Sequence, residues 1–140
     1  MRAPRVVAST EAGRLRPRGM GPRPGWRSSP KFDVCLGYIH ANYARSTSIS
    51  KLATRARISP SYMFRTFKRG TGFTPVQYRN LLRIEEARRL LRNRALSVEE
   101  VARQVGFDDP RYFSRVFKKE SGLSPREFRK QLGGRIEGER

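Results

Sequence analysis

After residue 31, apolar residues recur along the chain at spacings of three and four, the pattern of helices that each bury one face. The first predicted helix begins at Ser29-Pro30 and carries apolar residues as far as Tyr43. A longer helix is predicted over 75–93, where the apolar positions keep this spacing and charged residues occupy the opposite face. The pattern therefore predicts an all-α fold.

One part of the chain occurs twice. Residues 62–80 and 112–130 share the same aromatic, basic, glycine and proline positions, and residues 48–53 match residues 97–102. In each copy a short helix that begins at a serine is followed, after a tight turn, by a basic helix that ends at a glycine. Two short helices joined in this way form a helix-turn-helix. We therefore predict two helix-turn-helix units joined by the long helix, with the boundaries 48–72, 75–93 and 97–122.

Capping residues define the second copy more closely. Ser97 followed by Glu100 has the spacing of a capping box, so a helix begins there. Either Asp108 or Asp109 is expected to cap the next helix, because an aspartate oxygen accepts bonds from free amide groups at a helix start. A last, short helix is expected to run through Phe128.

The charge of the chain points to a polyanionic partner. Lys and Arg number 31 against 12 Asp and Glu, which gives a formal net charge of +19. Nucleic acid, an anionic membrane and the ribosome all fit that charge. Residues 31–80 hold nine basic residues and one acidic residue, residues 81–109 hold six of each, and residues 110–140 hold nine and four. Two basic units on either side of a neutral segment favour two separate contact surfaces.

The two ends of the chain differ from the part between them. Residues 1–30 contain seven Arg, one Glu and many Pro and Gly, without apolar periodicity, so we expect a disordered basic tail. A remnant of a longer protein, or a misassigned start site, explains these residues equally well. Trp26 in this tail is expected to be exposed. The ordered domain is expected over 31–131 and a frayed end over 132–140.

The composition argues against several classes of protein. One cysteine, Cys35, and one histidine, His40, allow neither an internal disulfide nor a metal cluster of Cys and His ligands. Cys35 is expected in the core and His40 in solvent. We expect no enzyme activity, no metal and no cofactor, because no nucleophile–base pair and no clustered carboxylates are present. No run of about 20 apolar residues suggests a membrane span, and no apolar stretch suggests a signal peptide.

The second copy resembles the C-terminal signature of the AraC/XylS family of bacterial transcription regulators. The matching residues are Val101-Ala102, Val105-Gly106-Phe107, Tyr112-Phe113-Ser114-Arg115-Val116-Phe117-Lys118-Lys119, Gly122, Ser124-Pro125 and Phe128-Arg129. Residues 82–91 are similar to the family's linker helix, and the first copy fits through Leu52-Ala53, Ser59-Pro60-Ser61-Tyr62 and Phe67-Lys68. The resemblance covers about residues 32–131. One departure is Arg57, which stands where the first turn often has Gly.

The resemblance implies about seven helices and sequence-specific binding of double-stranded promoter DNA. It also implies activation through RNA polymerase, in the cytoplasm of a bacterium and associated with its nucleoid. Base contacts carried over by position come from Ser61, Phe64, Arg65, Arg111, Ser114 and Arg115. Phosphate contacts are expected from Ser48, Lys68, Arg69, Ser97, Lys118 and Lys119, because cations and helix starts attract phosphate.

Several alternatives remain open at this stage. Arg65 and Arg115 could form ion pairs within the domain instead of contacting bases, and Phe64 could fill a gap against the long helix. The chain as a whole could bind DNA without sequence preference, as a nucleoid-architectural protein does. Many relatives carry a large ligand-sensing or dimerisation domain before this region, and no such small-molecule domain is visible here. The chain is therefore either a stand-alone regulator or the DNA-binding fragment of a longer one.

Overall fold

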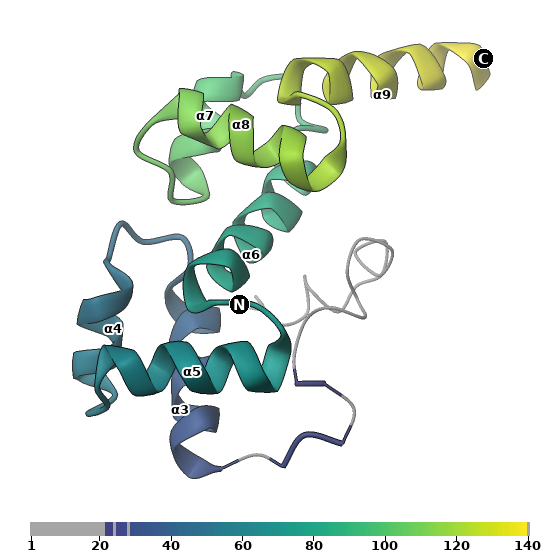
Figure 1. Ribbon diagram of the computed structural model, residues 1–140. Helices are drawn as coiled ribbons and strands as arrows, with labels where there is room; N and C mark the ends of the chain where they lie inside the picture. Colours follow the sequence, from purple (N-terminus) through teal and green to yellow (C-terminus); the bar gives the residue numbers. More distant parts are fainter. Residues whose placement is uncertain (1–21, 24, 28, 140) are drawn as a thin grey trace.

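The computed structural model describes residues 22–139 apart from residues 24 and 28, with side chains as far as residue 133. The described part contains helices and no strand, which confirms the predicted all-α fold (Figure 1). The helices are α3 (Pro30–Asn42), α4 (Ile49–Arg55), α5 (Pro60–Thr71), α6 (Pro75–Leu90), α7 (Val98–Gln104), α8 (Pro110–Ser121) and α9 (Pro125–Glu139). Of the tail that was expected to be disordered over 1–30, residues 1–21, 24 and 28 lie outside the described residues.

The helices begin where small polar residues precede proline or an apolar residue. In α5, the Ser59 side chain accepts a hydrogen bond from the Tyr62 amide at 3.1 Å, and Pro60 occupies the first turn, where no amide donor is needed. Of the two aspartates considered for α8, Asp109 is the cap and accepts from the Arg111 amide at 3.0 Å. The other caps are Ser29, Ser48, Thr74, Ser97 and Ser124.

Left-handed backbone positions end the second helix of each helix-turn-helix and shape the turn between its two helices. Gly72 and Gly122 end α5 and α8 at φ 90° and 86°, a region that glycine enters without steric cost. Gly106 has φ 109° in the turn between α7 and α8. The corresponding residue between α4 and α5 is Arg57, at φ 60°, the one non-glycine residue with positive φ in the described part of the chain. A side chain in that conformation costs roughly 1–2 kcal/mol.

Arg57→Gly is therefore expected to raise the free energy of unfolding by up to about 1 kcal/mol, because the strain is removed while some chain entropy is lost. Chemical denaturation of the two proteins measures the difference. Arg103→Gly serves as the control, because Arg103 lies within α7 and the same replacement there should cost about 1 kcal/mol. A loss of stability in both variants would contradict the assignment of strain to Arg57.

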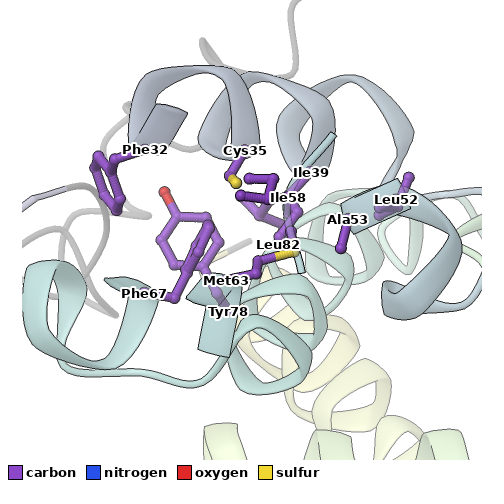
Figure 2. Close-up of a cluster of buried hydrophobic side chains, with 10 residues drawn as sticks. All are labelled: Phe32, Cys35, Ile39, Leu52, Ala53, Ile58, Met63, Phe67, Tyr78 and Leu82. Carbon is purple, nitrogen blue, oxygen red and sulfur yellow. The ribbon is translucent and has the colours of Figure 1, made fainter. Parts of the chain in front are cut away.

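Two apolar cores lie at opposite ends of α6 (Figure 1). The first core, shown in Figure 2, is enclosed by α3, α4, α5 and the start of α6. Its members are Phe32, Cys35, Ile39, Leu52, Ala53, Ile58, Met63, Phe67, Tyr78 and Leu82. The second core consists of Ile84, Ala87, Leu91, Val101, Ala102, Val105, Phe107, Phe113, Val116 and Phe117. Helix α6 therefore contributes side chains to both cores, and we call the two halves of the molecule the first and second units.

Two helix ends differ from the sequence-based expectation. Helix α6 ends at Leu90 rather than at residue 93, because the Arg92 and Asn93 amides bond three residues back and the Asn93 side chain accepts from the Ala95 amide at 3.0 Å. Its 16 residues span about 24 Å. Helix α9, expected to end near Phe128 before a frayed terminus, continues to Glu139.

The segment before α3 packs on the first unit, which corrects the expectation that Trp26 is exposed. Trp26 is half-buried, and its ring lies 5.6 Å from that of Phe32 in an edge-on contact. The Arg23 amide donates to the Gly70 carbonyl at 2.7 Å. A Cβ atom at Gly70 would lie only 2.9 Å from the Trp26 ring, so the absence of a side chain at Gly70 leaves room for the indole. A lone aromatic among Pro and Gly carried no periodic signal that would have revealed this contact.

His40 is half-buried rather than solvated. Its Nε2 lies 2.7 Å from the Tyr78 hydroxyl oxygen, and within the described chain its Nδ1 is buried without a hydrogen-bond partner. Burial lowers the pKa of His40 below its ordinary value. Cys35 is fully buried, as predicted, and burial raises the pKa of its thiol to about 11. Cys35 is therefore a core residue, whereas His40 lies at the edge of the first core against Tyr78.

Acidification should destabilise the fold through His40. Since the folded state disfavours the imidazolium, the unfolded state binds the proton more readily, and stability falls as the pH drops from about 6.5 through the lower pKa of the folded state. The melting temperature is therefore expected to decrease from pH 7 to pH 5, and less so in His40→Gln. His40 is the chain's one histidine, so the comparison of the variant with the wild-type protein isolates the histidine contribution. Equal decreases in both proteins would contradict this expectation.

Candidate nucleic-acid interface

Helices α5 and α8 are the second helices of the two helix-turn-helix motifs, and each has one buried and one exposed face. In α5, Met63 and Phe67 point into the first core, and in α8, Phe113 and Phe117 point into the second. The opposite faces carry the residues expected to contact DNA. Ser61, Phe64, Arg65, Lys68 and Arg69 are all exposed on α5; on α8, Arg111, Arg115, Lys118 and Lys119 are exposed and Ser114 is half-buried.

The two exposed faces correspond residue by residue. Arg65 occupies in α5 the place that Arg115 occupies in α8, and Lys68 likewise matches Lys118. Positions three and four apart share one side of a helix, so each arginine lies beside the lysine that follows one turn later. The structure thus places the predicted site residues of α5 and α8 on corresponding exposed faces of these two helices, which lie toward opposite ends of α6 (Figure 1).

Neither candidate arginine is held by a carboxylate within the described part of the chain. The ion pairs recorded there are Arg89–Glu86 and Lys118–Glu127, the latter at 3.8 Å between exposed groups. The Arg115 guanidinium lies 5.7 Å from the centre of the Tyr112 ring, which steadies it without neutralising it. Both guanidinium groups therefore remain available to an external acceptor.

Phe64 does not fill a gap against the long helix. Its side chain is 51% exposed, while its neighbours on the same face are basic or hydroxylated. A single exposed apolar side chain is common on protein surfaces, but Phe64 lies on the face that carries the other candidate DNA contacts of α5. The geometry thus favours the first of the two roles considered for Phe64, contact with an apolar group such as a thymine methyl.

The two serines at the starts of α4 and α7 are exposed but electrostatically different. The Ser48 oxygen accepts from the Lys51 amide at 3.1 Å, and no acidic residue lies in the first turn of α4. The Ser97 oxygen accepts from the Glu100 amide at 3.0 Å, and the Glu100 carboxylate accepts from the Ser97 amide at 2.8 Å. The environment of Ser48 therefore suits a phosphate better than that of Ser97.

Three exposed cations near Ser97 were not identified from the sequence. Arg94, Arg126 and Lys130 line a cleft together with Ser97, between the loop after α6, the start of α7 and α9. Arg126 and Lys130 are one turn apart on α9. Their spacing was the available signal, but it went unused because the helix was expected to end at Phe128.

The arginine that closes each repeat has a structural role. Arg129 donates from Nε to the Leu91 carbonyl at 3.0 Å and from Nη2 to the Asn93 carbonyl at 3.3 Å. Arg79, its counterpart, donates to the carbonyl of Thr47. In both units this arginine fastens the loop that precedes the helix-turn-helix, so neither is counted among the DNA contacts.

A metal or membrane role finds no support in the described residues. There, no three His, Cys, Asp or Glu side chains come together as a metal site would require. None of the helices in the same part of the chain combines the length and apolar character of a membrane span.

Comparison with known proteins agrees with the geometry. A family model described as a helix-turn-helix domain matches residues 52–131. Over 107 residues, 76% of the chain, the sequence is 33% identical to the HTH-type transcriptional activator RhaS of Escherichia coli. The chain spans 38% of the length of RhaS, and likewise about a third to two fifths of other curated relatives, such as 34% and 39% in two further cases.

Solved structures of similar domains share the fold. The C-terminal domain of AraT, a response regulator from Geobacillus stearothermophilus, superposes with a TM-score of 0.70 at 32% identity, covering 76% of this chain and 88% of that domain. The DNA-binding domain of AdpA, solved in complex with a target DNA, gives 0.68 at 30% identity, covering 77% of this chain and 96% of that domain. With its two helix-turn-helix units on one linker helix, the chain belongs to the AraC/XylS family of transcription regulators.

Proposed function

We propose that this chain is a sequence-specific DNA-binding transcription regulator, or the DNA-binding part of one, that reads two successive major-groove segments of a promoter. The observation that carries the proposal is the pair of equivalent basic faces on α5 and α8, each on the second helix of a helix-turn-helix. Such a helix fits the major groove, where base edges are distinguishable. The DNA-binding domain of AdpA, solved in complex with a target DNA, supports the same function.

The roles of individual residues follow from their chemistry. Arg65 and Arg115 read guanine through O6 and N7, and Phe64 contacts a thymine methyl. Ser61, Arg111 and Ser114 complete the base contacts. Phosphates are held by Ser48, Lys68, Arg69, Ser97, Lys118 and Lys119, which fix the register without specifying sequence.

The regulatory output is activation through RNA polymerase, in a bacterial cytoplasm. RhaS, which is named an activator, supports this direction. The chain spans under two fifths of the length of RhaS. The proposal therefore includes a second form, in which the chain is the DNA-binding fragment of a longer regulator that responds to an effector.

A second candidate is a DNA binder without sequence preference. The observation that favours it is the formal charge of +19, which suffices for tight electrostatic binding to any duplex. The specific and non-specific candidates differ in their affinity ratio, since specific sites bind roughly 10³–10⁷ times more tightly than random DNA at one salt concentration.

Selection of bound sequences from a random DNA pool, at about 150 mM salt, tests the proposal. We expect one motif of about 16–20 base pairs with two informative blocks roughly one helical turn apart, because recognition helices of one protein meet successive major grooves at about that spacing. A motif with one short block would mean that only one helix-turn-helix contacts the DNA. A pool that shows no enrichment would favour the non-specific binder.

A further inference from the structure

The two units meet at a polar seam beside α6. Ser46, in the loop between α3 and α4, donates its hydroxyl to the Asp108 carboxylate at 2.9 Å. Asn80 of α6 donates from Nδ2 to the Tyr112 hydroxyl at 3.2 Å. Since the apolar cores are separate, these contacts are not part of either core. The first joins the loop of the first unit to the turn of the second, and the other joins α6 to α8.

Arg83 lies at the centre of this seam. It stands on α6 between Leu82 of the first core and Ile84 of the second, and its side chain is only 5% exposed. Its Nε donates to the Tyr43 carbonyl at 2.6 Å and its Nη2 to the Arg45 carbonyl at 3.0 Å. The guanidinium carbon also lies 5.0 Å from the centre of the Phe107 ring. One side chain thus touches the first unit's loop and the second unit's turn.

Burial disfavours the charged form of this guanidinium, so it needs hydrogen-bond acceptors. Burial, together with the nearby Arg79, lowers the pKa of Arg83 to about 10, so the group is still charged at neutral pH. A buried charge persists only where hydrogen bonds satisfy it, and here two backbone carbonyls do so. The loop that supplies those carbonyls, residues 43–45, is therefore tied to α6.

Gly106 completes the arrangement from the second unit. A Cβ atom there would lie 2.7 Å from Arg83 Nε, 2.9 Å from Arg83 Cζ and 2.9 Å from the Tyr43 carbonyl oxygen. Gly106 therefore allows close approach as well as a positive φ. Its counterpart in the first unit is the exposed Arg57, where no such approach occurs. The difference between the two turns follows from the seam, which one turn faces and the other does not.

We propose that Arg83 and Gly106 form a clamp that fixes the second unit relative to the first, and so sets the number of base pairs between the two blocks of the DNA site. The effect on the spacing of the DNA site rests on the proposed function, whereas the fixed orientation of the two units does not. Without it, the units are joined by α6, which belongs to both cores, and by the Ser46–Asp108 and Asn80–Tyr112 hydrogen bonds. With it, loop 43–45, α6 and the 106–107 turn move as one body.

Spacing tolerance of the DNA site is the decisive measurement. Inserting one base pair between the two blocks moves the second block by about 3.4 Å and turns it by about 35°. The wild-type protein should lose roughly tenfold or more in affinity, as for a mismatched site. Gly106→Ala should lose no more than about threefold for the same insertion, because its second unit can turn.

Gly122→Ala is the matched control. Gly122 has a similar φ, 86°, but a Cβ atom there would meet nothing within 4 Å, so the variant carries the same backbone strain away from the seam. It should keep the wild-type penalty. A second pair, Arg83→Met against the exposed Arg89→Met, should behave in the same two ways. An unchanged penalty in folded Gly106→Ala and Arg83→Met would overturn the proposal.

Two further measurements cover the remaining outcomes. Should the buried substitutions unfold the protein, the exposed pair Ser46→Ala with Asp108→Ala loosens the seam more gently, and an unchanged penalty there would count against the clamp. Spin labels at Arg69→Cys and Lys119→Cys report the distance between α5 and α8 without DNA. A broader distance distribution in Gly106→Ala than in Gly122→Ala supports the clamp even if selection finds no motif, whereas equal distributions overturn it.

Discussion

Arg115→Ala is expected to weaken binding to the cognate site by about 1–3 kcal/mol, or roughly 5- to 150-fold, while affinity for random DNA changes little. Arg115 is exposed on α8, and no carboxylate in the described chain neutralises it. The loss should be confined to one base pair of one block, because a bidentate contact to guanine reads a single position. Gel-shift titration against the selected motif and a shuffled sequence measures both quantities.

Arg126→Ala provides the control for charge. Arg126 is also exposed but lies on α9, where it lines the cleft beside Ser97. Its removal should weaken binding to both sequences alike, since it takes away one positive charge and none of the proposed base contacts. Equal losses on both sequences with Arg115→Ala would remove Arg115 from the base contacts. The melting temperature of Arg115→Ala should stay close to that of the parent protein, because only an exposed ring contact is lost.

Phe117→Ala should reduce the free energy of unfolding by about 3–5 kcal/mol, enough to unfold a protein of ordinary stability at moderate temperature. Phe117 is fully buried, and its ring lies 5.7 Å from Phe113 and 5.5 Å from Phe128. Because α6 contributes to both cores, the first unit should melt in the same transition. Thermal unfolding followed by circular dichroism and by Trp26 fluorescence tests this, since Trp26 packs on the first unit.

Phe64→Ala separates stability from binding. Phe64 is also a phenylalanine on a second helix, but it is 51% exposed, so its removal should change the free energy of unfolding by no more than about 0.5 kcal/mol. Affinity for the selected motif should nevertheless fall. Two separate transitions in Phe117→Ala, one for each probe, would show that the two units unfold independently.

The internal repeat made most of the fold and of the candidate site predictable. The burial of Phe67 in α5 and of Phe117 in α8 follows from the apolar spacing. Helix geometry then puts the basic residues of the same two helices on the opposite face. Contacts between distant segments have no periodicity, and this explains what was missed. The buried edge of Trp26 and the half-buried His40 depend on partners far away in the sequence, Gly70 and Tyr78.

The seam was beyond sequence reasoning for a related reason. Arg83 reads as one more charge on a helix that carries several, and only the fold places it against two carbonyls of a loop. The end of α6 also depended on a local detail, the turn formed by the Asn93 side chain, which apolar spacing does not report. The DNA contacts themselves remain predictions, because exposure and charge define the face and only a complex defines the bases.

Leu82 and Ile84 are only two residues apart on α6 but belong to different cores. This restricts how the length of this chain can change in evolution. One residue added to α6 at this point would turn everything after it by about 100° and shift it by about 1.5 Å. Helix α8 would then point in a different direction and would lose its contacts with a fixed duplex. Insertions and deletions should therefore be absent from the middle of α6 in descendants of this protein, whereas residues 92–96, after the last turn of the helix, can accept them.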